Sequence, residues 1–211
     1  MAYNQLFGCK FYVSSGLASA KTVTSVTNAA PPVVSSTAHG YSNGNEIVLF
    51  NNWDFLKSTV VQASSVGANA WSIAGYDSTD TNYYPAASSS GTSQLVSGWL
   101  SMGQILDIQT SGGDADFEDL RPYDSLVGTK VFKGFSGASV TFTVGWDPAD
   151  ATQQSLQTTS RVAGKRAIKF ALPGGKFVYG YGTTIASPMP KFESVLKQAV
   201  VVTFDGINTI F

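Results

Sequence analysis

The amino-acid sequence predicts a mainly all-β protein: an antiparallel β-sandwich or partial barrel with one flanking α-helix, plus an inserted small β-barrel module. Three observations support this prediction. Short apolar runs separated by turn residues recur along the first half of the chain, as in small all-β modules. Residues 138–146 alternate apolar and polar side chains, as a half-buried antiparallel strand does. One stretch alone, 146–162, has convincing helix-start residues.

Composition narrows the class of protein. The chain has 211 residues, enough for one large domain or for a domain with a sizeable insert. Charged residues make up 13% of the chain, about half the usual share, which suits a surface covered by neighbouring molecules and also suits secreted β-proteins. Cys9 is the only cysteine, so neither an internal disulfide nor a cysteine-based zinc cluster is expected.

Targeting signals are not expected either. A signal peptide has a charged region followed by a long apolar run, and the first sixteen residues lack this combination. No stretch approaches the roughly 18 apolar residues that a membrane span needs. We therefore expect an intracellular product of a reducing compartment.

The first elements are a strand at 9–16 and then the inserted module at 20–92. Turn residues separate the strand-like runs of this module at close spacing, and the polar stretch "AASSSGTS" at 86–93 is expected to close it as a linker. The main domain would then consist of 1–19 and 93–211. The expected strands of the module are "KTVTSVT", "PPVVSST", "EIVLF", "STVVQASSV" and "AWSIAGY".

Paired strands are expected next, at 94–110, with Gly98 and Gly103 as bend or bulge points. In the alternating strand at 138–146, the apolar side chains would face one way and the Ser and Thr side chains the other. The apolar residues of this strand are Val140, Phe142, Val144 and Trp146.

The helix is predicted over 148–159. Asp147 would be its N-cap, Pro148 its first residue and Asp150 an acid of its first turn, and Leu156 would pack on the sandwich. A hairpin follows at 166–187 with "PGG" as its turn. One or two final strands complete the chain within 193–211.

The segment "SGGDADFEDLRPYDSL" at 111–126 is unusually acidic. In an EF-hand register, position six would be Asp119 instead of Gly and position twelve Ser125 instead of Glu, so that motif fails, although an irregular calcium site stays open. Paired-carboxylate catalysis is disfavoured, because nothing here would bury a carboxyl and raise its pKa. We expect 110–136 to be a long exposed loop, and loops of such length are usually functional.

The other candidate catalytic and phosphate-binding features are also disfavoured. The single histidine, His39, lies in a Gly- and Asn-rich turn and is expected to hydrogen-bond local backbone. No nucleophile elbow occurs, and "LPGGK" at 172–176 lacks the spacing of a phosphate-binding loop. No enzyme signature remains. We expect an assembly or binding protein without catalytic residues, cofactor or metal.

From residue 95 to 211 these features follow one another in a set order. A strand ending in "GQILDI" leads into the Gly-Gly-acidic segment, then come "SVTFTV", the Asp-initiated helix, the "LPGG" hairpin and "VTFDG". This order resembles that of the tail tube proteins of long-tailed bacteriophages. Within the insert, "VVSSTAHGYSNGNEIVLF" is similar to a small β-barrel module, akin to a subdomain of ubiquitin-activating enzymes, that recurs in phage structural proteins. Asn45 stands where that pattern usually has Asp, and the resemblance brings no enzymatic activity with it.

The resemblance implies a structural subunit of the phage tail. Such subunits form stacked hexameric rings, and each contributes an inner sheet to a barrel whose lumen passes the genome during ejection. The implied partners are further copies of the chain, the terminator, baseplate or tip and tape measure proteins at the tube, and DNA that passes non-specifically; no membrane is involved. The implied location is the virion tail, after synthesis in the bacterial host cytoplasm.

The distribution of charge along the chain indicates how neighbouring copies would contact each other. Residues 1–124 carry 4 Lys and Arg against 10 Asp and Glu, and residues 125–211 carry 9 against 4, a split that favours head-to-tail contact. In tail tube proteins the corresponding loop reaches the neighbouring ring. We therefore expect an acidic inter-ring docking loop and a basic partner surface. The acidic residues are Asp114, Asp116, Glu118, Asp119 and Asp124, and the basic ones are Lys165, Arg166, Lys169 and Lys176.

Two alternatives remain. Within the structural class, the chain could be another tube-like virion or injection-system protein, such as a baseplate hub or a contractile-injection tube. From a different class, it could be a carbohydrate-binding β-sandwich whose insert presents an aromatic platform. The residues of that platform would be Trp53, Trp71, Tyr76, Tyr83 and Tyr84.

Overall fold

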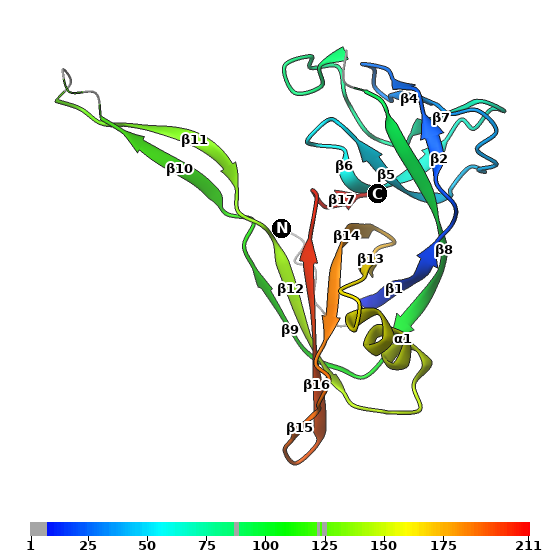
Figure 1. Cartoon of the computed structure of the whole chain (residues 1–211), viewed down its shortest axis with the longest axis vertical. Helices are drawn as coiled ribbons and strands as arrows, with labels where there is room; N and C mark the ends of the chain where they lie inside the picture. The colour runs from blue at the N-terminus through cyan, green and yellow to red at the C-terminus, as the bar shows by residue number, and fades with distance from the viewer. Residues whose placement is uncertain (1–7, 87–88, 122, 124–125) are drawn as a thin grey trace.

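The computed structural model of the chain describes residues 8–86, 89–121, 123 and 126–211 (Figure 1). Within these ranges the strands pair antiparallel and one helix lies beside them, so the predicted mainly β fold is confirmed. The strands of the main body are β1 (Lys10–Leu17), β8 (Gly91–Met102), β9 (Ile105–Ser111), β12 (Ser139–Gly145), β13 (Lys165–Ala171), β14 (Phe177–Ala186), β15 (Lys191–Phe192), β16 (Leu196–Phe204) and β17 (Thr209–Ile210).

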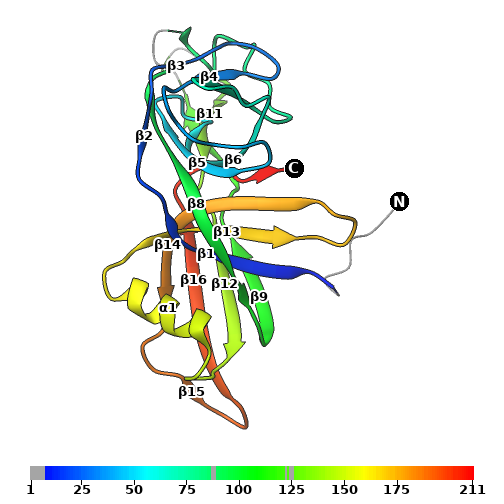
Figure 2. The ribbon, with the colours of Figure 1, turned by 90° about the vertical axis from the view of Figure 1, so that its right-hand side faces the viewer.

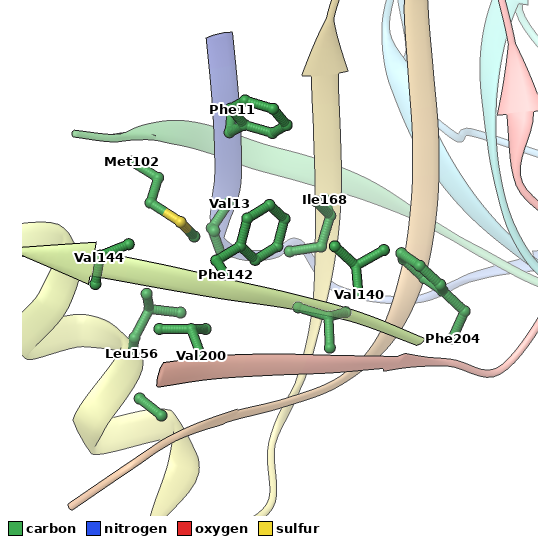
Figure 3. Close-up of a cluster of buried hydrophobic side chains, with 12 residues drawn as sticks. Phe11, Val13, Met102, Val140, Phe142, Val144, Leu156, Ile168, Val200 and Phe204 are labelled. Carbon is green, nitrogen blue, oxygen red and sulfur yellow. The ribbon is translucent and has the colours of Figure 1, made fainter. Parts of the chain in front are cut away.

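The alternating strand is confirmed as β12, which lies between β16 and β9. Its apolar residues Val140, Phe142 and Val144 are buried, whereas the Ser and Thr residues between them are half-buried on the opposite face. Phe142 is fully buried at the centre of the main core, with its ring centroid 5.5 Å from that of Phe11 on β1. Figure 3 shows the side chains of β12, β1 and the helix gathered in this core.

The predicted hairpin is confirmed as β13 and β14. Its turn closes where the Leu172 amide donates to the Lys176 carbonyl at 2.8 Å, and Gly174 and Gly175 supply the positive φ angles that the turn needs. Ile168 lies opposite Gly180 in the register, so Ile168 and Tyr179 occupy opposite faces of the hairpin. The two faces of the hairpin therefore pack in two different hydrophobic clusters.

The helix α1 (Ala151–Ser160) begins three residues later than predicted. Asp150 is its N-cap, because an oxygen of its carboxylate accepts hydrogen bonds from the amides of Thr152 at 2.7 Å and Gln153 at 3.1 Å. The assignment of Asp147 as N-cap, and of Asp150 to the first turn, was wrong. Asp147 instead accepts from the Ala149 amide in the turn before the helix. Packing through Leu156, which is 2% exposed, is confirmed.

Among the described residues, no helix is long and apolar enough to cross a membrane. The two strands expected at 94–110 are confirmed as β8 and β9, but the expectation that they pair with each other was wrong, because β8 pairs with β1 and with strands of the insert and β9 pairs with β12. Gly103 lies between these strands, and the pairing of β8 with β1 shifts register beside Gly98. Both glycines therefore mark irregularities, as predicted.

The five strand-like runs of the insert all contain strands, and Trp53 and Trp71 lie in their shared core. The strand β8 starts at Gly91 and pairs first with strands of the insert and then with β1. It therefore continues without a break across residue 92, the predicted end of the insert. Ser89, within the expected linker, is buried. The strands of the insert are β2 (Lys21–Val23), β3 (Ser25–Val26), β4 (Val33–Ser35), β5 (Glu46–Asn51), β6 (Lys57–Ser64) and β7 (Ala70–Ile73).

The insert also packs on the body. Val48 and Val60 of the insert share a buried apolar cluster with Tyr179 and Tyr181 of β14. The hydroxyl of Thr209 on β17 donates to the carbonyl of Val60. Side chains of the insert therefore cover the second face of the β13–β14 hairpin.

Candidate assembly surfaces

The acidic segment is a β-hairpin that projects from the body (Figure 1). Its strands are β10 (Ala115–Leu120) and β11 (Thr129–Phe135), which pair antiparallel from Ala115 opposite Phe135 to Leu120 opposite Thr129. The prediction of a long loop over 110–136 was therefore wrong, although the predicted exposure is confirmed for its described residues apart from Gly134. Acidic residues are poor strand formers, so they concealed the strand, whereas "TKVFKGF" on the second arm is a strand-like run that could have revealed it.

The described acids of this hairpin are all exposed. Asp119 lies 3.8 Å from Lys130 and Glu118 lies 3.9 Å from Lys133, across the hairpin, and exposed pairs of this kind contribute little to stability. Asp124 lies outside the described residues. No group of three or more His, Cys, Asp and Glu residues in the described part of the chain could hold a metal ion.

The hairpin also carries exposed aromatic side chains. The ring centroids of Phe117 and Phe132 are 5.8 Å apart, those of Phe132 and Phe135 are 5.2 Å apart, and the three residues are 52%, 51% and 63% exposed, respectively. A lone two-stranded hairpin is marginally stable in water, and exposed apolar clusters of this kind mark interaction sites. The acids are the candidate residues predicted from the sequence, and these phenylalanines are not among them.

The four basic residues expected on the partner surface do not form one exposed patch. Lys165 pairs with Asp205 at 2.6 Å, and the hydrogen bond that its ammonium donates to that carboxylate raises the pKa of the lysine. Arg166 donates to the Thr159 hydroxyl at 2.6 Å and to backbone carbonyls of β1. Lys169 pairs with a carboxylate of the insert. Of the four residues, Lys176 in the β13–β14 turn is the one that is exposed and has no such contact within the described part of the chain.

One face of the sheet formed by β9, β12, β16 and β14 is left uncovered by the described residues. The other face carries the main core, against which α1 packs. Side chains on the uncovered face are half-buried or exposed, and most are small or uncharged; Asp107 and Lys197 are the charged exceptions, and Lys197 pairs with Glu193 at 2.7 Å. The face consists of Asp107, Gln109, Ser111, Ser139, Thr141, Thr143, Thr183, Ile185, Lys197, Ala199, Val201 and Thr203.

The aromatic platform of the carbohydrate alternative does not form a surface. Trp53 and Trp71 are each 1% exposed and belong to the core of the insert. Tyr76 and Tyr84 are half-buried, with their hydroxyls 3.1 Å apart, and Tyr83 alone is exposed.

His39 is a structural turn residue, as expected. Its Nδ1 accepts a hydrogen bond from the Tyr41 amide at 3.0 Å, which leaves Nε2 to donate to the Gly67 carbonyl at 3.0 Å. Both ring nitrogens are therefore engaged, and the residue is 3% exposed.

Comparison with known proteins identifies the family of the chain. The family model described as phage tail tube protein, TTP, matches residues 51–211, which is most of the chain. No curated protein matches the chain.

Proposed function

The chain belongs to the phage tail tube protein family, and on this premise we propose that it assembles as stacked hexameric rings whose lumen passes the genome during ejection. Membership makes it a structural protein of the virion tail that associates with itself and with other tail proteins. The family is a structural class and not an enzyme class.

The uncovered sheet face is the observation that carries the proposal. A lumen through which DNA slides should not be strongly basic, because phosphate contacts would hold the duplex. The face of β9, β12, β16 and β14 meets this requirement. Thr141 and Gln109 lie side by side at its centre, and its one lysine is neutralised by Glu193. We assign this face to the lumen.

The edge of the same sheet supports ring closure. The strand β9 ends the sheet order, so one of its sides has no strand partner within the described residues. Exposed edges attract other strands, and a closed barrel removes them. Pairing of β9 with the sheet of a neighbouring subunit would extend the sheet around the ring and give each subunit a share of one continuous wall.

The acidic hairpin fits contact between rings. It extends from the end of β9 and the start of β12, so it continues the two strands assigned to the lumen wall and projects beyond the body (Figure 1). We propose that Asp114, Asp116, Glu118 and Asp119 set register against the next ring, since complementary charges give orientation more than affinity. The exposed phenylalanines would contribute the affinity.

The remaining assignments follow from the same premise. We take residues 20–92 to be an inserted module on a tube domain made of 1–19 and 93–211. The terminator, the baseplate or tip and the tape measure protein are the expected partners of the assembled tube. Synthesis would take place in the cytoplasm of the bacterial host, before the subunit joins the virion.

Negative-stain electron microscopy of the purified protein tests the proposal. We expect tubes with a central hole, lengthening as the protein concentration rises. Rings that stop at one layer would favour the baseplate hub or another tube-like protein. A monodisperse monomer at every concentration would contradict the proposal.

A further inference from the structure

A groove of about 700 Å³ lies between the loops of the insert and the base of the acidic hairpin. Three parts of the chain line it: the loops of the insert at Phe55 and Tyr83, the base of the hairpin from Phe132 to Ala138, and the segment 204–208. Its lining is largely apolar, and Tyr83, Phe135 and Ile207 are 59%, 63% and 43% exposed, respectively. We call it the apical groove.

One end of the long axis carries an apolar turn (Figures 1 and 2). Residues 187–195 connect β14 to β16, and within them β15 pairs back on β16, so the turn is a short hairpin. Met189, Phe192 and Val195 are 68%, 73% and 54% exposed, respectively. Pro188 and Pro190 restrict its backbone. We call it the docking turn.

The two apolar features do not meet within one molecule, because the docking turn lies at one end of the long axis and the insert, whose loops line the groove, lies toward the other (Figure 1). Their charges are complementary: with Lys197 paired to Glu193, Lys191 leaves the docking turn with a net positive charge, while Asp54 lines the apical groove and Asp114 follows Gly113 in its wall. A groove of this volume falls within the roughly 300–1,000 Å³ range of pockets that bury drug-sized groups, so it can accept the side chains of a turn.

We propose that the docking turn of one copy seats in the apical groove of the next copy, with Phe192 and Met189 entering the apolar lining. The contact joins two different surfaces, so it repeats without closing and propagates along an axis. This inference rests on the proposed stacking and adds the pair of surfaces that would carry it. The insert thereby contributes one wall of the stacking contact.

Replacement of Phe192 tests the contact. The Phe192→Ser variant replaces an apolar side chain that is exposed in the single copy. We therefore expect the variant to keep its fold, which circular dichroism measures. Tube formation should require at least about tenfold more protein, the change that the loss of one buried aromatic side chain implies. Val162→Ser is the matched control, because Val162 is 77% exposed and belongs to neither surface. Phe192→Ser tubes that form at the wild-type concentration would overturn the inference.

Cross-linking between copies gives an independent test. In a Cys9→Ser background, one variant carries Phe192→Cys and another carries Ile207→Cys, and a short bismaleimide is added. We expect covalent dimers when the two variants are mixed and none from either alone. Dimers of Phe192→Cys alone would instead show turn-to-turn contact and overturn the inference. Tubes without cross-linking of the mixture would overturn the inference and leave the proposed function standing, whereas a wild-type protein that forms no tubes would overturn both.

Discussion

Glu46 and Lys169 join the insert to the body through a largely buried ion pair. An oxygen of the Glu46 carboxylate accepts from the Lys169 ammonium at 2.6 Å, although the residues are 123 positions apart, and their side chains are only 14% and 16% exposed. The same oxygen accepts from the Tyr179 hydroxyl at 2.6 Å. Burial, with this hydrogen bond, raises the pKa of Tyr179. The ammonium lies 4.5 Å from the ring centroid of Phe177.

Breaking this pair should destabilise the chain. In Glu46→Gln the Lys169 ammonium would stay largely buried without its counter-charge. Because both side chains keep some exposure, we expect a loss of about 3 kcal/mol, the lower end of the range for a buried pair that loses one partner. Urea denaturation measures it.

The double variant Glu46→Gln, Lys169→Met serves as control and should recover most of this loss, because it removes both charges and keeps an amide oxygen that can accept from the Tyr179 hydroxyl. A double-mutant cycle with a coupling energy near zero would show that the pair does not hold the insert in place.

The helix start offers a matched pair of variants. Asp150→Ala removes the side chain that accepts from two amides of the first turn and should cost about 1 kcal/mol of unfolding free energy. Asp147→Ala removes a single hydrogen bond before the helix and should cost less. Denaturation curves of the two variants compare them directly, and the opposite order would return the cap to Asp147.

Neutralising the hairpin tests its role in stacking. With Asp114, Asp116 and Asp119 changed to Asn and Glu118 changed to Gln, we expect folded monomers or single rings where the wild type forms long tubes. Wild-type assembly should weaken with added salt, since exposed charges are screened over about 8–10 Å, and should be insensitive to chelator. Electron microscopy with sedimentation measures both. Normal tubes from the neutralised protein would end the docking role, and tubes dissolved by chelator would point to a metal.

Labelling tests the assignment of the lumen. In a Cys9→Ser background, Thr141→Cys should react with a small maleimide in monomer and tube alike, but with a bulky polymer-linked maleimide only in the monomer. Thr79→Cys, on an exposed turn of the insert, should react with both reagents in both states. Equal reaction of Thr141→Cys with the bulky reagent in tubes would place β12 on the outside.

Some of this structure could be predicted because its signals are local. The alternation of Val140, Phe142 and Val144 with hydroxyl residues states which face of β12 is buried, and "PGG" marks the β13–β14 turn. The helix start was misplaced because Asp147 and Asp150 offer the same capping chemistry three residues apart, and only the local hydrogen bonds choose between them.

The rest has no local signal. Both faces of β10 and β11 are exposed in the single chain, so burial imposes no alternating pattern that would reveal a strand. Lys169 looked like part of an exposed basic cluster because its partner, Glu46, is distant in sequence. The roles of the hairpin acids and of the lumen face depend on neighbouring copies and remain predictions.

A helical reconstruction of the purified tubes by electron cryomicroscopy tests the central claim most directly. The account predicts rings of six subunits around an open lumen, with the Thr141 face of β9, β12, β16 and β14 lining the channel and the acidic hairpin reaching the next ring. A lumen lined by the insert or by α1 would contradict this assignment, as would a filament without a central channel.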